Sequence, residues 1–220
     1  MSIQKLLASR HSVRDFLPKP IDSDLLQSIF GKAQQSASNC NVQPWQTYVV
    51  SGEKRNELEK RLMHNLVTDP NPAPEFDWTP RYQDIHRERQ FGSANALYSA
   101  LGIERSDKRA RQMAMAANWQ FFGAPHAVFF CMEKYLGIMG AVDLGIYAQT
   151  LSLLLEEEGI SCCMQGALGQ FPKPVKEVLA IPDSMGVLFG MSLGYANPDA
   201  LANDARTNRV ELQESVLFFE

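Results

Sequence analysis

The chain has 220 residues, of which 45% are hydrophobic and 21% are charged, and its formal net charge at pH 7 is −4. This composition is typical of a globular domain and argues against a disordered chain, a coiled coil or a collagen-like repeat. The net negative charge also argues against a nucleic-acid-binding protein, whose domain is usually basic. No repeat, linker or low-complexity stretch divides the sequence, so we expect a single domain over residues 1–220.

The first third of the chain alternates between helical patterns and polar turns. In chain order, we expect a helix over 2–9, a polar turn over 10–16, a helix from 22 or 23 to about 33, a small-polar loop over 35–41, a strand over 46–50 and a helix over 53–67. Ser2 is the expected cap of the first helix, and Asp22 or Ser23 that of the second, because their side-chain oxygens accept hydrogen bonds from a first helical turn.

A proline-rich stretch follows at residues 68–80 and also carries Phe76 and Trp78. Such a density of proline is incompatible with a helix or a central strand. We therefore expect a surface excursion. It is either a lid that brings aromatic side chains to a binding site or inert surface, and the pattern leaves both open.

The rest of the chain mixes helices with apolar strands. In chain order, we expect helices over 81–101 and 106–122, a strand over 126–132, a helix over 138–158, a strand over 160–166, a short helix after Pro172 and a strand over 185–196. Because these strands alternate with helices, we expect an α+β fold whose sheet contains some parallel pairing. The apolar residues 216–219 are expected to dock either on the chain's own core or on a partner subunit.

We expect neither a membrane span nor a signal peptide. The most apolar stretch, residues 138–155, contains Asp143 and precedes three glutamates, which favours a buried helix. The four cysteines form neither a disulfide framework nor a Cys-x-x-Cys pair, which favours a reducing, cytoplasmic setting. Cys162 and Cys163 lie in an apolar strand and are expected to be buried structural thiols.

The one match to a known catalytic motif lacks the neighbouring structure that the motif requires. Residues 190–194 match the Gly-x-Ser-x-Gly pattern of a hydrolase nucleophile, but Pro198 stops any following helix and the last histidine, His126, precedes Ser192. We therefore expect Ser192 to be an ordinary strand residue. The sequence has no glycine-rich dinucleotide or Walker phosphate loop, and its histidines and cysteines lack metal-ligand spacing, so no metal site is predicted.

Arginines gather near both ends of the chain. Arg10 and Arg14 flank Ser12 directly after the first helix, and Arg206 and Arg209 lie near the C-terminus. The forked donors of paired guanidinium groups suit a phosphate. The other interpretation is a set of surface arginines that are either solvated or paired with Asp15 and Glu211. The residues alone leave both interpretations open.

Three blocks of the sequence resemble, in the right order, the FMN-dependent nitroreductase family. They are RHSVRDF at 10–16, SASNCNVQPW at 36–45 and GISCCMQGALG at 159–169. The strand that ends at residues 194–196 and the arginines of the tail are similar to the last strand and C-terminal arm of that family, so the resemblance spans nearly the whole chain. The stretch YSALGI at 98–103 looks closest to the nitrobenzoate-reductase branch.

The resemblance implies an α+β, helix-rich nitroreductase-like fold with a central mixed sheet, in an intertwined homodimer that holds FMN at each of two subunit interfaces. It implies FMN-binding roles for residues in four segments: Arg10, His11, Ser12 and Arg14 in the first block; Ser36, Ala37, Ser38 and Asn41 in a loop that reaches the FMN of the other subunit; Gln165 and Gly166 in a turn beside the flavin; and Arg206 at the phosphate. No side chain is expected to act as the catalyst, because the flavin carries the electrons. The family often has Pro-Ser where Ala37-Ser38 stands here, and Glu or Gly where Gln165 stands, which leaves the substrate range open.

The function implied by the resemblance is an NAD(P)H oxidoreductase that reduces nitroaromatic, quinone or related acceptors by ping-pong transfer, with residues 68–122 near the acceptor pocket. The choice between NADH and NADPH stays open. Within the fold, the alternative is a flavoenzyme for one specific metabolite, through enone reduction, dehalogenation or flavin chemistry. The alternative of another class is a non-catalytic protein that binds a small anion or flavin. The expected partners are a second copy of the chain and a small-molecule acceptor, with no nucleic acid and no membrane.

Overall fold

The computed structural model describes residues 1–77 and 81–220, so Trp78 lies outside the described residues. Its helices and strands are, in chain order, α1 (Ile3–Ser9), α2 (Ser23–Ala33), β1 (Gln46–Ser51), α3 (Gly52–Thr68), α4 (Asp84–Ala100), α5 (Lys108–Ala116), β2 (His126–Glu133), α6 (Gly137–Glu157), β3 (Ser161–Gln165), α7 (Pro172–Leu179), β4 (Met185–Gly194) and α8 (Leu212–Ser215). Short 3₁₀ segments include η1 (Asn39–Asn41), η4 (Gly166–Gly169) and η5 (Leu201–Asp204). The α+β expectation is confirmed, and the elements lie close to their expected ranges.

The sheet has the strand order β1-β2-β4-β3, and each neighbouring pair is antiparallel. The expected mixed sheet is therefore wrong for the named strands of the described chain. β2 and β3 do point the same way, as a helical crossover through α6 requires. However, β4 inserts between them and runs opposite to both. Parallel pairing occurs only as an isolated bridge between Ser12 and Cys162 among the described residues.

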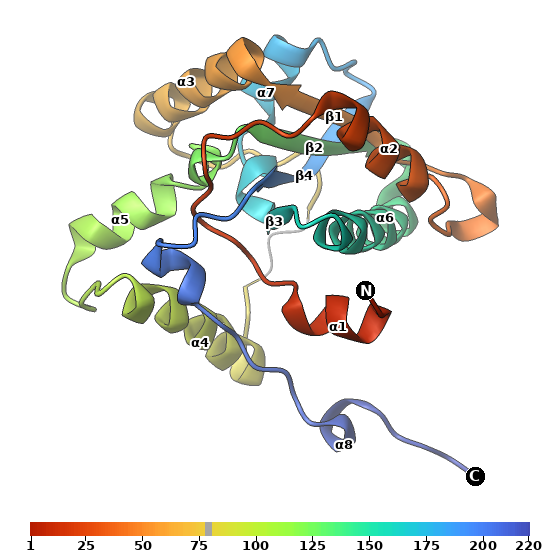
Figure 1. Cartoon of the computed structure of the whole chain (residues 1–220). Helices are drawn as coiled ribbons and strands as arrows, with labels where there is room; N and C mark the ends of the chain where they lie inside the picture. The colour runs from red at the N-terminus through yellow and green to blue at the C-terminus, as the bar shows by residue number, and fades with distance from the viewer. Residues whose placement is uncertain (78–80) are drawn as a thin grey trace.

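The sheet is buried on both faces because its central strands are apolar throughout. Along β2, residues Ala127, Phe129 and Cys131 pack in one core cluster with side chains of α3 and α7. The alternate residues Val128 and Phe130 pack in the second cluster with α2 and α6. This is the two-residue period of a strand. Figure 1 shows the result, with α3 and α7 above the sheet and α6 below it.

Helix α6 is only half buried. Tyr147 and Leu151 are fully covered by the sheet, whereas Ile138 is 81% exposed and Val142 is 49% exposed. The expectation of a buried helix therefore holds for one face. Within the described chain, the segment Lys134–Glu157 has the length and hydropathy of a membrane span, a test that the core helix of a soluble protein also passes.

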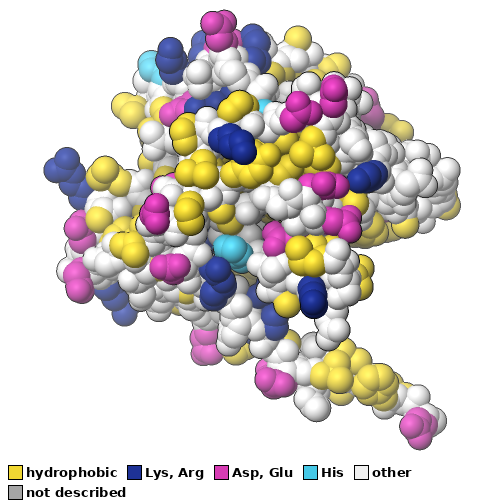
Figure 2. Space-filling model, in the orientation of Figure 1, with side chains coloured by type: hydrophobic (Ala, Val, Ile, Leu, Met, Phe, Trp, Pro, Cys, Tyr) yellow, Lys and Arg dark blue, Asp and Glu magenta, His cyan; other side chains and the backbone are white. Residues whose placement is uncertain are grey.

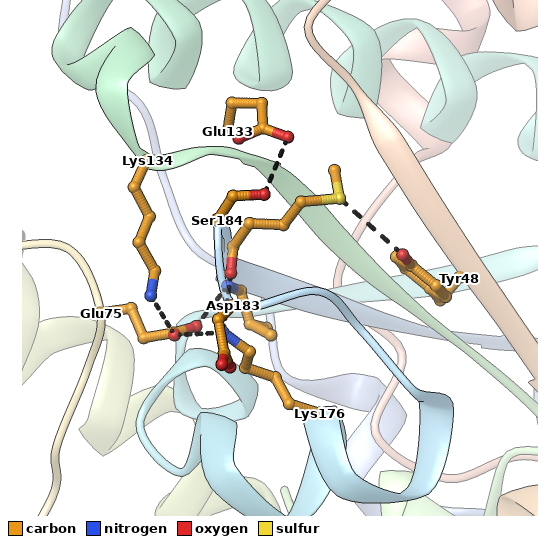
Figure 3. A network of polar contacts seen from close by, with 9 residues as sticks. Tyr48, Glu75, Glu133, Lys134, Lys176, Asp183 and Ser184 are labelled. Carbon is orange, nitrogen blue, oxygen red and sulfur yellow. Dashed lines mark hydrogen bonds and ion pairs between the residues drawn. The ribbon is translucent and has the colours of Figure 1, made fainter.

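The middle of the proline-rich stretch is held against the sheet by the partly buried carboxylate of Glu75 (Figure 3). One oxygen of Glu75 lies 2.8 Å from Nζ of Lys176 and 2.9 Å from Nζ of Lys134, and the other accepts the backbone N–H of Val187 at 2.9 Å. Phe76 packs beside the start of β4, where a Cβ on Gly186 would stand 2.6 Å from its ring. Phe76 is partly buried and packs against the second core cluster.

Candidate functional site

The arginines of the two chain ends line one cavity of about 320 Å³. Its wall is made by the end of α1 and the segment that follows it, by α4 and by the segment after η5. The lining residues are Leu7, Ala8, Arg10, His11, Ser12, Arg14, Ser93, Ala96, Ala205, Arg206, Thr207 and Arg209. The wall includes four arginines and no carboxylate. Such a set of guanidinium groups suits a phosphate or another anion.

These four arginines form no ion pair with a carboxylate among the described residues. Asp15, the expected surface partner, instead accepts a hydrogen bond from Nδ2 of Asn197 at 3.0 Å. Arg206 uses its Nη1 to donate to the backbone carbonyl groups of Asn203 and Ala205. Arg10 makes no side-chain hydrogen bond within the described chain. Pairing with neighbouring carboxylates is therefore not seen for these four arginines in the described chain, and the interpretation as solvated surface arginines stays open.

A buried asparagine joins the two chain ends. Asn203 accepts the backbone N–H of Arg14 at 2.7 Å, and its Nδ2 donates to the carbonyl oxygens of Asp15 at 2.8 Å and Asn197 at 3.0 Å. These bonds fasten η5 beside residues 14–15 and so bring Arg206 to Arg10 and Arg14. The sequence analysis missed Asn203, because a single asparagine in a tail carries no recognisable signal.

Strand β3 lies beside the first arginine block. The backbone N–H of Val13 donates to the carbonyl of Cys162 at 3.2 Å. Burial raises the pKa of the Cys162 thiol to about 12, and burial also raises the pKa of Cys163 despite the nearby Arg14. Both thiols are therefore protonated at neutral pH, as expected for structural cysteines, and neither is a nucleophile.

Gln165, the last residue of β3, points its side chain into the protein. Oε1 of Gln165 accepts the Ser192 hydroxyl, and Nε2 donates to the backbone oxygen of Asn118 at 2.9 Å. Gln165 is 2% exposed, whereas the next residue, Gly166, is exposed. The turn therefore offers backbone rather than the glutamine side chain to a ligand. Ser192 is fully buried in β4, so the rejection of a nucleophile elbow is confirmed.

Two glycines let this turn pack against the sheet. A Cβ on Gly169 would collide with the backbone carbonyl of Leu188, and one on Gly190 would stand 2.9 Å from the carbonyl oxygen of Val128. Real side chains do not tolerate such approaches to backbone atoms. The rigid sheet thus fixes the position of Gly166 through η4.

The loop with Ser36, Ala37, Ser38 and Asn41 lies elsewhere, against α6, and contributes no wall to the arginine cavity. The Asp143 carboxylate accepts the backbone N–H of Asn39 at 3.0 Å. The hydroxyl of Ser38 accepts the backbone N–H of Gln43 at 3.0 Å. Cys40, Asn41 and Gln43 have φ values of 48°, 56° and 49°, so the loop holds a strained, defined shape.

A second cavity of about 510 Å³ adjoins the first and shares Arg14 and Ser93 with it. It lies between α4 and the region of α5, and its wall consists of Arg14, Tyr82, His86, Arg89, Gln90, Ser93, Ala94, Leu97, Tyr98, Ala114, Met115, Asn118 and Phe122. Asn118, which lines this cavity, accepts a hydrogen bond from Gln165 through its backbone oxygen. The cavity therefore extends to the end of β3 and the turn that follows it. The sequence analysis placed residues 68–122 near such a pocket, but of these side chains it named only Arg14 as a site residue, and that for the cofactor.

Comparison with known proteins agrees with the resemblance seen in the sequence. Residues 7–195 match the Nitroreductase family. A 4-nitrobenzoate reductase from Pseudomonas putida is 34% identical over 206 residues, which cover 93% of this chain and 89% of that protein. Nitroreductase NfnB from Mycolicibacterium smegmatis is 32% identical over 216 residues, which cover 98% of this chain and 92% of that protein.

Two solved structures share the fold over almost the full length of both chains. The FMN and NADPH-dependent nitroreductase NfnB from sphigopyxis sp. strain HMH has a TM-score of 0.96 and 34% identity and covers 100% of both chains. The FMN-dependent nitroreductase NfnB from Mycobacterium smegmatis, in complex with NADPH, has a TM-score of 0.94 and 31% identity and covers 99% of this chain and 97% of its own. The match of fold, length and sequence blocks means that this chain belongs to the nitroreductase family.

Proposed function

We propose that this chain is an FMN-dependent NAD(P)H oxidoreductase that reduces nitroaromatic acceptors. The relatives with more than 30% identity include proteins named as a nitrobenzoate reductase and as FMN and NADPH-dependent nitroreductases. The observation that carries the proposal is the arginine cavity, whose wall has no carboxylate. It shares Arg14 and Ser93 with a second cavity, whose wall includes Asn118, the hydrogen-bond partner of Gln165.

The residues present fit FMN. Arg10, Arg14 and Arg206 would hold its phosphate, with the Ser12 region completing the cradle. The exposed backbone at Gly166 would face the edge of the ring system, since glycine permits a close approach. The inward Gln165 side chain would fix this backbone rather than touch the cofactor.

When bound, FMN would supply the redox chemistry by accepting hydride from NAD(P)H and passing electrons to the acceptor. Reduction of a nitro group to a nitroso group consumes two electrons and two protons and releases one oxygen atom as water. NAD(P)H supplies two electrons and one proton, and solvent supplies the second proton. The chain's own task is to bind the cofactor and to orient the donor and the acceptor against it.

The same proposal includes a homodimer. The apolar face of α6 is exposed, and the tail residues Leu217, Phe218 and Phe219 are 75%, 80% and 90% exposed. Figure 2 shows hydrophobic side chains on this arm, which projects from the body of the molecule. A second copy would cover both surfaces, and the loop on α6 would then serve the partner's cofactor. Such a shared interface should bury more than about 2,000 Å².

We further infer that α4 and α5, within residues 68–122, form the wall of the acceptor pocket, because these helices line the second cavity. Phe76 packs beside Gly186 at the start of β4 and takes no part in that wall. A reducing, cytoplasmic setting suits the cysteines, which are all free thiols in the described chain.

The proposal is tested with two arginine variants. Arg10→Gln removes a charge whose side chain makes no hydrogen bond within the described chain, and Arg206→Ala removes the second guanidinium group. Each should weaken FMN binding by roughly ten- to a hundredfold, the range expected for one charge-assisted contact. Arg61→Gln is the matched control, since Arg61 pairs on the surface with Glu177. FMN affinity is measured by titrating the apoprotein and following flavin fluorescence.

Three outcomes are decisive for this test. If Arg10→Gln and Arg206→Ala bind FMN as tightly as the Arg61→Gln control, these arginines do not hold the FMN phosphate. If the protein binds FMN but does not oxidise NAD(P)H when a nitroarene is the acceptor, the result would favour the alternative of a flavoenzyme that acts on one specific metabolite. Protein that binds phosphate but no FMN would favour the non-catalytic anion-binding alternative.

A further inference from the structure

The segment between α5 and β2 contains a strained turn. Its 3₁₀ segment η2 (Phe121–Gly123) has φ values of 55° at Phe121, 52° at Phe122 and 77° at Gly123. Glycine adopts this left-handed region freely, but bulky residues are outliers there and need surrounding contacts to hold them. The two aromatic side chains belong to the first core cluster and are 0% and 9% exposed. The turn is therefore held against the local preference of its own residues.

A single arginine of α3 fastens both ends of this turn. Nε of Arg55 donates to the carbonyl oxygen of Ala124 at 3.0 Å, and Nη2 donates to that of Gln120 at 2.9 Å. Cζ of Arg55 lies 5.2 Å from the centroid of the Phe121 ring, and Nη1 pairs with Glu59 of the same helix. The Arg55 side chain is 11% exposed, so these contacts are largely shielded from water. One planar group thus fixes the carbonyl groups on either side of the strained residues.

The second aromatic residue of the turn faces two cavities. Phe122 lines the second cavity, of about 510 Å³, and also a third cavity of about 350 Å³ between α4, α5 and η5. The two walls have four residues in common, which are Arg14, Leu97, Ala114 and Phe122. Most of the other side chains of the third cavity are apolar. Phe122 is the only aromatic residue among the four.

We propose that Phe122 separates the second cavity from the third and thereby limits the length of the acceptor, and that Arg55 is the positioning residue that holds Phe122 there. This inference rests on the proposed function and concerns the acceptor end of the same site. Removal of the Phe122 ring would join the two cavities into one elongated space. A second ring on the acceptor would then be buried among apolar side chains, whereas in wild type it would meet the Phe122 ring.

The experiment compares a short and a long acceptor. The probes are nitrobenzene and 4-nitrobiphenyl, which differ by one phenyl ring opposite the nitro group. The readout is the ratio of kcat/KM for 4-nitrobiphenyl to that for nitrobenzene, at saturating FMN and with one nucleotide throughout. It is measured in wild type, Phe122→Ala and Phe122→Gly, because alanine keeps the strained φ and glycine adopts it freely. The control is Met113→Ala, which shortens an exposed side chain that lines the third cavity but not the second.

We expect wild type to prefer nitrobenzene. Both Phe122 variants should raise the ratio by about tenfold or more, since a single methylene group in an apolar pocket already changes kcat/KM by about ten- to two-hundredfold. Met113→Ala should retain the wild-type ratio. Wild type that reduces both acceptors equally well would overturn the proposal without any variant. So would an unchanged ratio in Phe122→Gly, or an equal rise in Met113→Ala.

The same ratio tests Arg55. Arg55→Lys keeps the charge but loses the fork that bonds the two carbonyl groups, so it should raise the ratio by a smaller factor than Phe122→Gly does. Glu59→Gln removes the ion pair and leaves both carbonyl bonds in place, so it should retain the wild-type ratio. A loss of stability alone would affect both acceptors alike. An unchanged ratio in Arg55→Lys would therefore exclude a positioning role for Arg55.

A failure of the proposed function is distinguishable from a failure of this inference. If neither acceptor is reduced, the activity assignment fails, and ligand binding still decides whether Phe122 separates the cavities. Phenol and 4-phenylphenol lack a reducible nitro group, and equilibrium dialysis measures their binding to the FMN-loaded protein. Phe122→Gly should strengthen the binding of 4-phenylphenol relative to phenol by about tenfold. The same relative affinity in wild type and Phe122→Gly would overturn the inference as well.

Discussion

The Glu75 carboxylate should be a main determinant of stability, and Glu75→Gln tests this. Its side chain is 14% exposed and that of Lys176 is 12% exposed, so their contact is largely desolvated, while Lys134 is 42% exposed. Glutamine keeps the shape of the side chain but loses its charge. Its amide NH₂ group is a donor, so wherever it points, toward the lysines or toward the N–H of Val187, one hydrogen bond is lost. Losing one charged hydrogen bond costs about 1.5–3 kcal/mol, and the more exposed pair adds about 0.2–1 kcal/mol.

The expected destabilisation is therefore about 2–4 kcal/mol, which corresponds to a shift of roughly 1 M in the urea midpoint. The matched control is Glu57→Gln, which breaks the exposed pair between Lys54 and Glu57 and should leave the midpoint nearly unchanged. Protein and FMN concentrations must be held constant, because ligand binding and dimerisation also shift the midpoint.

The pH dependence gives a second check on Glu75. Burial raises its pKa, but the hydrogen bonds from Lys176, Val187 and Lys134 outweigh burial and leave the pKa below its ordinary value of 4.5. A depressed folded-state pKa stabilises the fold above the unfolded pKa, and the contribution is lost as the pH falls through the folded value. The difference between wild type and Glu75→Gln should thus be constant from pH 7 to about 5 and shrink below about 4.5. A midpoint shift equal to that of the control, or a difference that grows in acid, would refute the reasoning.

The remaining predictions concern the loop, the joined chain ends, the dimer and the kinetics. Asp143→Ala should weaken FMN binding by about tenfold, because the N–H of Asn39 loses its acceptor, while Asp143→Asn should rescue binding; equal losses in a fluorescence titration would argue against a positioning role. Asn203→Ala should lower stability by about 2–4 kcal/mol in urea unfolding, since the N–H of Arg14 and two carbonyl groups lose their partner; a change below about 1 kcal/mol would contradict this. Truncation after Ser215 should weaken the dimer and FMN retention together, as followed by light scattering and absorbance, and a folded monomer that retains FMN would exclude the proposed interface. Initial rates should give parallel double-reciprocal lines, because both substrates use one cavity, whereas intersecting lines would indicate a ternary complex.

Local elements were predictable because their determinants lie within a few residues of one another. Ser2 caps α1 by accepting the N–H of Lys5 at 3.4 Å, and Asp22 caps α2 by accepting two N–H groups. The apolar run at residues 126–132 became the central strand β2. Helix α7 begins at Pro172, as expected for a residue that lacks an N–H.

The direction of the strands was not predictable in the same way. The alternation of strands and helices indicated parallel neighbours, and β2 and β3 do run parallel to each other. The position of β4 between them depends on which strand edge the chain returns to, and that choice is made by packing over the whole sheet. The close contacts at Gly169 and Gly190 show how tightly that packing is specified.

For the candidate site, the sequence by itself determined the chemistry: two arginine pairs in an acidic chain, a glycine turn after an apolar strand, and no nucleophile motif in a suitable context. The tertiary structure decided which groups meet. Asn203 joins segments 189 residues apart, and Asn118 and Gln165 are 47 residues apart. Side-chain type sets what a group can bind, and this is readable residue by residue. A cavity, in contrast, exists only where distant backbone segments are held together by hydrogen bonds and packing that have no local pattern in the chain.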